Sequence, residues 1–277
     1  MKTLQNKQIP ASKMGRVITD VDLANLDAAG AEKIKQAVSE CGAVNVKGPN
    51  LLPDQLDAMT SKIGDIVTLP EGLAFDNQVQ GLETVVRISN IRKDGTLIKS
   101  HKGAEYWHQD GDFRPGKGIY VWNLLHSHTV PSQGGETGFL DAQRVLQIIP
   151  KWLNDFFASH KSKLIPSKIP DFDKETASKI SEVLHNCIQK HPVTNAESLY
   201  LGSISVTEMD GIPNALWKEI LAYLMECFDK EENRYIHKWE SGDTLIWDNT
   251  LVYHRSMGGY GDEPRLLYRT QAMMFQK

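Results

Sequence analysis

The sequence places two potential metal ligands two residues apart, in the segment Trp107-His108-Gln109-Asp110. Residues i and i+2 of a strand point to the same side, so a strand here would direct an imidazole nitrogen of His108 and a carboxylate oxygen of Asp110 to one point. His254 is the best candidate for a third ligand, because it follows a strand predicted at 244–247. Two His and one carboxylate occupy one face of an octahedron, which suits non-haem Fe(II) that must keep positions open.

A second pair of His residues, His126 and His128, has the same spacing. No carboxylate accompanies this pair, so we interpret both residues as parts of a core strand or as outer partners of a site. A ligand role for them is the alternative. His191 is given no ligand role.

Two arginines near the end of the chain could bind an anion. Residues 265–273 are expected to form a strand, in which a period of two places Arg265, Leu267 and Arg269 on one face. Two guanidinium groups beside a Leu are unusual for a solvent face, and a planar guanidinium binds a carboxylate through two hydrogen bonds. Thr137, after the turn at 134–136, could donate a hydrogen bond from its hydroxyl to the same anion. The alternatives are that the two arginines lie on an exposed basic edge and that residues 134–137 form an ordinary hairpin turn.

The elements that must position these residues change in character along the chain. Helical spacing of apolar residues predicts helices at 27–41 and 52–63, the second with Asp54 as its N-cap. From about Glu83, short runs rich in Val, Ile, Tyr and Trp alternate with Gly and Asp, which is typical of a β-sandwich or barrel. The predicted strands are 43–46, 84–88, 118–125 and 244–247, and the remaining predicted helices are 141–149 (capped by Asp141), 150–157, 176–189 and 214–228.

The sequence contains no repeat, low-complexity tract or Pro/Gly/Ser linker. We therefore expect residues 1–277 to form a single α+β domain. Residues 161–173 carry several Lys and Pro residues and are expected to be a solvated surface connection, with a lid over the site as the alternative.

Composition narrows the class of protein. The 277 residues are 40% hydrophobic and 24% charged, which is enough apolar material for a large core and excludes a mostly disordered chain. A net charge of −4 argues against wholesale binding of nucleic acid through a basic surface. No apolar run approaches the roughly 20 residues that span a bilayer, and the first residues lack the apolar core of a signal peptide. Three distant cysteines indicate reduced thiols and a cytoplasmic protein.

Taken together and in order, the motifs resemble those of the taurine dioxygenase and 2,4-dichlorophenoxyacetate dioxygenase (TauD/TfdA) family of Fe(II)/2-oxoglutarate-dependent enzymes. The resemblance covers nearly the whole chain. It is carried by Asp20-Val21-Asp22-Leu23, Ala43-Val44-Asn45-Val46, Trp107-His108-x-Asp110, Pro131-Ser132-Gln133-Gly134-Gly135-Glu136-Thr137, His191-Pro192-Val193 with Leu199-Tyr200, Gly242-Asp243-Thr244-Leu245-Ile246-Trp247-Asp248-Asn249, His254, Arg265 and Arg269.

This resemblance implies a double-stranded β-helix, or jelly roll, with helices packed outside. It implies that His108, Asp110 and His254 bind Fe(II), and that Thr137 and Arg265 hold the distal carboxylate of 2-oxoglutarate. Arg269 would lie beside the cosubstrate or bind an anionic group of the substrate. O₂ would be the second cosubstrate, and the products would include succinate and CO₂. Because the carboxylate ligand is present, the expected outcome is hydroxylation, desaturation or bond cleavage rather than halogenation.

The chain departs from the family pattern at Glu136, where Asp is usual, and at Thr250, where Arg is common. Residues 64–105 and 161–189 have no close match, so the sequence does not name the substrate beyond a small molecule with a carboxylate, a sulfonate or a similar anion. Relatives are often oligomers, so a homo-oligomer is possible. Two alternatives remain open: a jelly-roll enzyme with another metal, and a non-catalytic protein that binds small molecules.

Overall fold

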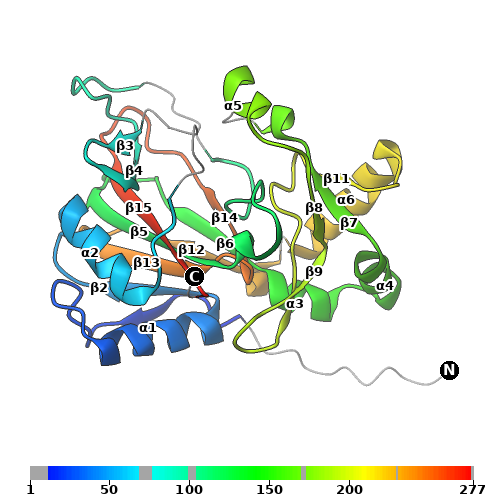
Figure 1. Cartoon of the computed structure of the whole chain (residues 1–277), viewed down its shortest axis with the longest axis horizontal. Helices are drawn as coiled ribbons and strands as arrows, with labels where there is room; N and C mark the ends of the chain where they lie inside the picture. Colours follow the sequence, from blue (N-terminus) through cyan, green and yellow to red (C-terminus); the bar gives the residue numbers. More distant parts are fainter. Residues whose placement is uncertain (1–11, 69–76, 99–103, 170–172, 229, 276–277) are drawn as a thin grey trace.

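A seven-stranded sheet forms the centre of the computed structural model, which describes residues 12–68, 77–98, 104–169, 173–228 and 230–275 (Figure 1). Its strands follow the order β1-β2-β13-β5-β15-β4-β3, so segments from both ends of the chain lie side by side. All of its neighbouring pairs are antiparallel except β1 and β2. The strand bounds are β1 Arg16–Ile18, β2 Ala43–Lys47, β3 Gln78–Val79, β4 Leu82–Ser89, β5 Val121–Thr129, β13 Asp243–Asp248 and β15 Leu266–Met273.

A smaller antiparallel sheet packs against the inner face of the large one. It contains β12 (Arg234–His237), β6 (Thr137–Asp141) and β14 (Val252–Ser256), in that order. The two sheets share a buried apolar core to which both contribute side chains. The core residues are Ala43, Leu125, Phe139, Leu245, Trp247, Leu251, Val252 and Leu267. Two facing antiparallel sheets with helices outside them form the predicted α+β jelly roll.

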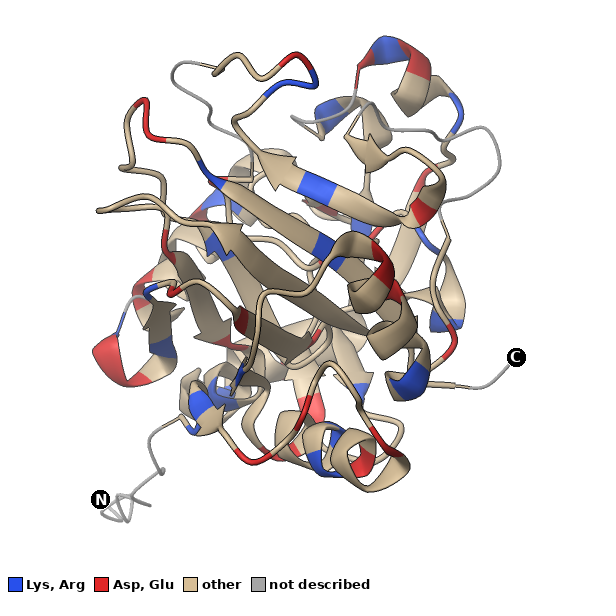
Figure 2. Ribbon diagram, turned by 90° about the vertical axis from the view of Figure 1, so that its left-hand side faces the viewer, with Lys and Arg blue, Asp and Glu red and all other residues tan. Residues whose placement is uncertain are grey.

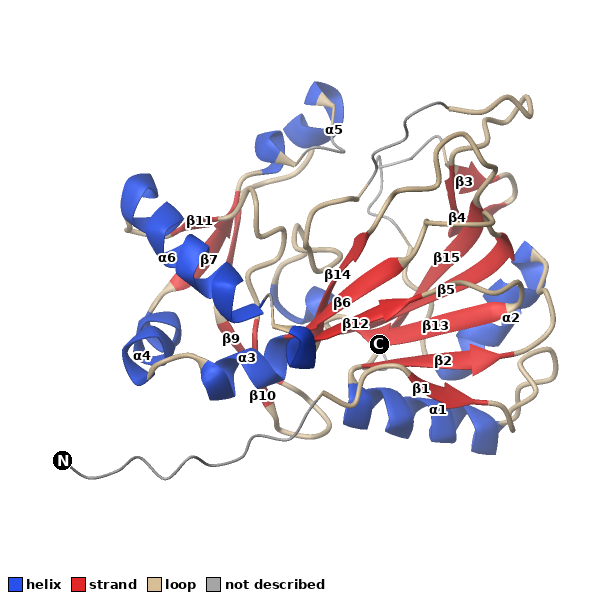
Figure 3. Cartoon of the chain, turned by 180° about the vertical axis from the view of Figure 1, so that it is seen from behind, coloured by secondary structure: helices blue, strands red, loops and turns tan. Residues whose placement is uncertain are grey.

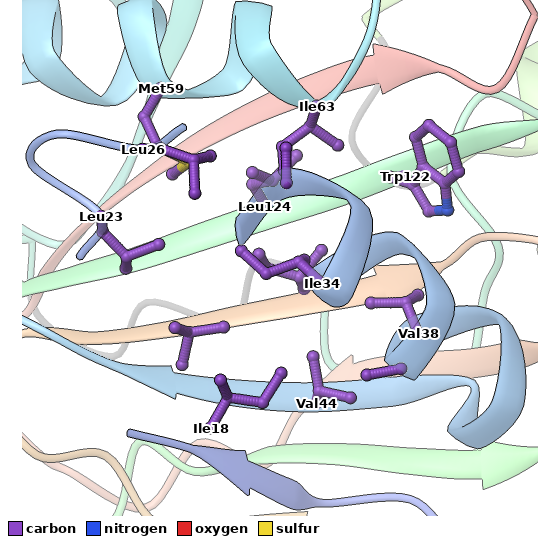
Figure 4. Close-up of a cluster of buried hydrophobic side chains, with 14 of the residues drawn as sticks. Ile18, Leu23, Leu26, Ile34, Val38, Val44, Met59, Ile63, Trp122 and Leu124 are labelled. Carbon is purple, nitrogen blue, oxygen red and sulfur yellow. The ribbon is translucent and has the colours of Figure 1, made fainter. Parts of the chain in front are cut away.

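Two helices cover the outer face of the large sheet. The first is α1 (Ala28–Cys41), whose N-cap Asp27 accepts a hydrogen bond from the Gly30 N–H, and the second is α2 (Pro53–Ile63). Figure 4 shows Ile34 and Val38 of α1 pointing toward Val44 and Leu124 on the strands. Helical spacing puts these apolar residues on one face, and their burial stabilises the layer.

The predicted cap of α2 is wrong. Leu52 occupies the N-cap position, and Asp54 lies in the first turn, where a carboxylate still interacts favourably with the positive end of the helix dipole. A Pro at the first helical position sets the start of this helix two residues earlier than a cap at Asp54 would.

The remaining helices lie at the other end of the strands, as seen from behind in Figure 3. They are α3 (Ala142–Ile148), α4 (Lys151–Ser159), α5 (Lys174–Ser178) and α6 (Asn214–Phe228). Two small sheets accompany them: β11-β7-β8 (Glu208–Met209, Lys161–Leu164, Val183–Asn186) and β10-β9 (Glu197–Leu199, Ile188–Lys190). Phe228 of α6 packs against Tyr253 of β14, with ring centroids 5.3 Å apart, so this layer supports the small sheet from outside.

Three predicted elements differ from the structure. The helix expected at 176–189 is the short helix α5 followed by the strands β8 and β9, and the connection expected at 161–173 contains strand β7 and a 3₁₀ turn at Pro166–Lys168. Residues 170–172 lie outside the described part of the chain. The strand expected at 118–125 begins at Val121, because Gly116–Ile119 form a 3₁₀ turn.

Charged residues of both signs are interspersed over the ribbon in Figure 2. The cysteines Cys41, Cys187 and Cys227 are free and buried, as predicted. Across the described ranges, no helix combines the length and the apolar character that crossing a bilayer requires.

The packing of α1 and α2 on the large sheet leads to a prediction for the stability of a core variant. Leu124 is fully buried beneath these helices, so Leu124→Ala should lower the free energy of unfolding by about 2–5 kcal/mol through lost burial and a residual cavity. Leu216→Ala is the matched control, because Leu216 lies on α6 with 51% of its surface exposed. Urea titration followed by circular dichroism would measure both, and equal losses would contradict this packing.

His126 of β5 predicts a pH dependence of stability. Its Nδ1 lies 2.9 Å from the Thr244 hydroxyl and its Nε2 accepts the Leu51 N–H at 2.8 Å, an arrangement that requires a neutral ring. Burial, together with the charge of His128, lowers the pKa of His126 to about 4, whereas an unfolded His titrates near 6.5. The unfolded state therefore binds more protons between these values, and stability is lost as the pH falls through this window.

We expect this residue to remove about 2 kcal/mol of stability between pH 7.5 and pH 5. Urea titrations at the two pH values should show a smaller loss for His126→Gln than for the wild-type protein. Leu216→Ala, a substitution of an exposed residue that does not titrate, is the control, and its pH dependence should match the wild type. An unchanged pH dependence in His126→Gln would refute the assignment of a neutral buried ring.

Candidate metal centre

The backbone of His108 pairs with the backbone of His254. The His108 N–H donates to the His254 carbonyl at 3.1 Å, and the His254 N–H donates to the His108 carbonyl at 2.9 Å. These two bonds form an isolated antiparallel bridge. Residues directly opposite one another in such a bridge project their side chains to the same face. The two imidazole rings therefore lie next to each other, with centroids 4.2 Å apart.

The carboxylate of Asp110 lies close to both rings. Its oxygens lie 3.8 Å from His108 Nε2 and 3.8 Å from His254 Nε2. One ligand atom from each residue lies within 4.8 Å of the others, so the group could hold a metal ion. The predicted trio is thus brought together by the structure. The strand predicted for residues 107–110 is wrong, because only His108 has a bridge partner and the chain turns at Asp110.

The protonation states of these residues suit a cation. His108 Nδ1 lies 2.8 Å from the Tyr106 carbonyl, which can only accept, so Nδ1 donates to it, and Nε2 is the ring nitrogen that lies 3.8 Å from Asp110. Burial, with help from neighbouring His108, lowers the pKa of His254 to about 3, which keeps that ring neutral. Burial opposes ionisation of Asp110, but the charge of Arg269 outweighs it and holds the pKa of Asp110 below its usual value.

Arg269 lies against the carboxylate of the trio. Its Nη1 donates to both oxygens of Asp110, at 3.0 and 3.1 Å. Arg269 lies on β15, and Gln271, two residues further along the same face, places its Nε2 3.5 Å from Asp110 Oδ2. The period-two prediction for this strand therefore extends to Gln271, which the same reasoning could have found.

Asn249 holds the backbone of Asp110. Its Oδ1 accepts the Asp110 N–H at 2.8 Å, and its Nδ2 donates to the Asp110 carbonyl at 2.8 Å and to the Ile119 carbonyl at 3.0 Å. The side chain is fully buried just beyond the end of β13. Sequence reasoning assigned Asn249 no role, because its partner lies 139 residues away.

Asp248 fixes the turn that carries Asn249. Its Oδ2 lies 2.7 Å from His191 Nε2, and its Oδ1 accepts hydrogen bonds from the Thr250 N–H and hydroxyl. All four of these residues are buried. His191 is therefore a structural partner and not a ligand, as predicted.

The other two residues predicted to bind an anion, Arg265 and Thr137, are both buried. Arg265 is 4% exposed, and its Nε and Nη2 donate to the Gly135 carbonyl at 3.2 and 3.1 Å. Thr137 is buried opposite Ser256 of β14, and its hydroxyl accepts the Trp239 indole N–H at 3.1 Å. Gly135 makes room for the arginine, because a Cβ there would lie 3.1 Å from Arg265 Nε. An exposed basic edge, the alternative for Arg265, is excluded by this burial.

A cavity of about 400 Å³ opens onto the candidate metal centre. His108, Asp110, Arg269 and Gln271 lie on one side of it. Its other lining residues come largely from 77–98 and 104–114, and so in large part from the range 64–105, in which the sequence has no close match to the family pattern. They include the apolar residues Val86, Ile88, Ile98, Phe113 and Ile169. Such a pocket suits a small ligand with an apolar body.

The second predicted His pair lies away from this centre. His126 occupies the face of β5 that also carries Trp122 and Leu124 and packs toward α1 and α2. His128 is exposed near the end of the same strand. The ligand alternative for this pair is therefore wrong.

Comparison with known proteins identifies relatives of the whole chain. The model of the family described as "Taurine catabolism dioxygenase TauD, TfdA family" matches residues 5–271. The α-ketoglutarate-dependent sulfate ester dioxygenase of Pseudomonas putida is 27% identical, over 94% of this chain and 86% of that protein. The (S)-phenoxypropionate/α-ketoglutarate dioxygenase of Sphingobium herbicidovorans is 26% identical, over 93% of this chain and 91% of that protein.

Solved structures agree in fold. AAD-2 in complex with Mn(II) and N-oxalylglycine superposes with a TM-score of 0.78 at 21% identity, covering 95% of this chain and 96% of that one. A taurine dioxygenase from Burkholderia xenovorans gives a TM-score of 0.76 at 23% identity, covering 95% and 89% of the two chains. At these identities the likeness establishes the jelly-roll fold.

Proposed function

The chain belongs to the TauD/TfdA family of dioxygenases, and we propose that His108, Asp110 and His254 hold the iron of this enzyme. It is an Fe(II)- and 2-oxoglutarate-dependent oxygenase that uses O₂, acts on a small anionic molecule and releases succinate and CO₂. The observation that carries the ligand assignment is the convergence of two imidazoles and one carboxylate, with one ligand atom of each within 4.8 Å of the others. This donor set matches the two-His, one-carboxylate arrangement of non-haem Fe(II) oxygenases.

The residues of this chain position and protect the reacting groups. When bound, Fe(II) supplies the activation of O₂, with 2-oxoglutarate as the source of electrons. His108 is held in the required tautomer by the Tyr106 carbonyl, and Asp110 is kept ionised by Arg269. Burial of all three ligands keeps bulk water from the centre.

We also propose that Arg265 and Thr137 bind the distal carboxylate of 2-oxoglutarate. Burial of a guanidinium whose described partner is the Gly135 carbonyl supports this role, because a buried cation is stabilised by an anionic partner. Arg269 reaches the same centre from β15, and its contact with Asp110 supports a place beside the cosubstrate or the substrate. Fixing both small molecules in one orientation lowers the entropic barrier to reaction.

Relatives act on sulfate esters and phenoxypropionate, which supports a substrate with a sulfate, sulfonate or carboxylate group for this chain. The reaction would be hydroxylation, desaturation or cleavage of a C–heteroatom bond. The family match over 5–271 supports a single catalytic domain, and the three buried free thiols support a reducing, cytoplasmic setting. Assembly into a homo-oligomer stays a prediction.

Removal of a ligand tests the metal assignment. His108→Ala and Asp110→Ala should each reduce succinate formation from 2-oxoglutarate by at least about a hundredfold, because one of three protein ligands is lost. The assay would supply Fe(II), 2-oxoglutarate and O₂ and detect succinate by mass spectrometry. His160→Ala, outside the centre, is the control and should keep wild-type turnover. Wild-type succinate formation in either ligand variant would remove the assignment.

Asn249, which holds the backbone of Asp110, offers a test in which metal affinity should fall although all three candidate ligands remain. Asn249→Asp keeps the size of the side chain but removes the donor to the Asp110 and Ile119 carbonyls, so Mn(II) should bind about 10–100-fold more weakly. Electron paramagnetic resonance titration of free Mn(II) would measure the affinity, and thermal unfolding would confirm that the variant is folded. Asn214→Asp, at the exposed start of α6, is the control. Equal affinities in the two variants would contradict the role of Asn249 in holding Asp110.

A further inference from the structure

Arg114 lines the cavity beside the candidate metal centre, together with Arg87 and Arg269. Its Nη2 donates to Gln271 Oε1 at 3.1 Å, and the same Gln271 faces Asp110. Its Nη1 is buried and has no hydrogen-bond partner among the described residues. Among the residues that the structure describes, no carboxylate lies at ion-pair distance from Arg114. Arg114 therefore lines the cavity, and its Nη1 donors are unused.

The side chain of Arg114 is held in place by its surroundings. A Cβ at Gly111 would lie 2.8 Å from Arg114 Nη1, and a Cβ at Gly118 would lie 2.8 Å from Arg114 Cβ. Both positions thus leave the space that the arginine occupies. The guanidinium carbon lies 5.3 Å from the centroid of the Phe113 ring, over which it packs. A long flexible side chain confined in this way loses little further entropy when it binds a ligand.

The charges around the cavity do not balance at Arg114. Asp110 is already paired with Arg269, and the carboxylate of Asp112 accepts hydrogen bonds from the Ser203 N–H and hydroxyl at 2.9 and 2.7 Å. Three arginines, Arg87, Arg114 and Arg269, thus line a cavity in which the carboxylate of Asp110 is already paired with Arg269. A cation partly removed from water without a counter-ion is destabilised, so an anion placed between Arg114 and the cavity would restore the balance.

We propose that Arg114 binds the anionic group of the substrate through its guanidinium and thereby sets substrate specificity. This inference rests on the proposed function, because it concerns the ligand of the same cavity. The anion is a carboxylate, a sulfonate or a sulfate, whose paired oxygens match a guanidinium. The rest of the molecule is apolar, since Val86, Ile88, Ile98 and Ile169 line the same cavity. The substrate class is therefore a small amphiphilic anion that fits about 400 Å³.

Binding of matched anionic and neutral probes tests this role. The protein would be loaded with Mn(II) and N-oxalylglycine, and calorimetry would compare phenoxyacetate with phenoxyethanol and hexyl sulfate with hexanol. We expect at least one anion to bind about tenfold or more tightly than its neutral counterpart, and Arg114→Gln to abolish that preference. Arg114→Lys keeps the positive charge but loses the planar pair of guanidinium donors, so it should retain part of the preference for the anion. Arg16→Gln, a distant exposed arginine, should behave as the wild type.

The outcomes separate three explanations. Equal binding of anionic and neutral probes by the wild type, or an anion preference that survives in Arg114→Gln, would overturn the proposal. A weaker affinity of Arg114→Gln for N-oxalylglycine with unchanged anion binding would also overturn it and would reassign Arg114 to the cosubstrate. Absence of succinate formation by the wild-type enzyme with Fe(II), 2-oxoglutarate and O₂ would instead refute the proposed function, independently of Arg114.

Discussion

Two backbone hydrogen bonds between His108 and His254 set the geometry on which the candidate metal centre depends. They join segments almost 150 residues apart and place both imidazoles on one side of a single bridge. The positions of the rings are therefore fixed by the main chain, and their side-chain torsions need only complete the arrangement. His254 lies on β14, which pairs with β6, so the centre inherits the rigidity of the small sheet.

Asp110 is the point at which the hydrogen-bonding and charge networks meet. Asn249 holds its main chain from the end of β13, while Arg269 and Gln271 approach its carboxylate from β15. Both strands belong to the large sheet, and both are neighbours of β5. The carboxylate is thus positioned by the large sheet and the second His by the small one, so the centre forms only where the two sheets face each other. This explains how a short segment without regular secondary structure can carry two of the three candidate ligands.

The sequence predicted the helices at α1 and α6, the strand β13 and the ligand trio, because each depends on local pattern or on a short motif. It failed at 176–189, where apolar residues such as Val183, Cys187 and Ile188 fit helical spacing although the segment pairs as strands with β7 and β10. Asn249 and Arg114 were not identified, since their roles arise from contacts with residues distant in the chain or from packing against glycines. Gln271 lay within reach of the period-two argument that found Arg265 and Arg269.

The edge position of β4 has a consequence for how this protein can diversify. Val86 and Ile88 line the cavity from a strand that pairs only with β15 and the short β3. The candidate ligands and the residues that hold them lie on β14, on β15, just beyond the end of β13 and in the segment 108–110. Exchanging side chains on this border strand disturbs no hydrogen bond of the centre. The apolar wall of the cavity on β4 and the candidate metal centre therefore lie on separate elements, so related enzymes can acquire new substrates by changing side chains on this edge strand while the centre is kept.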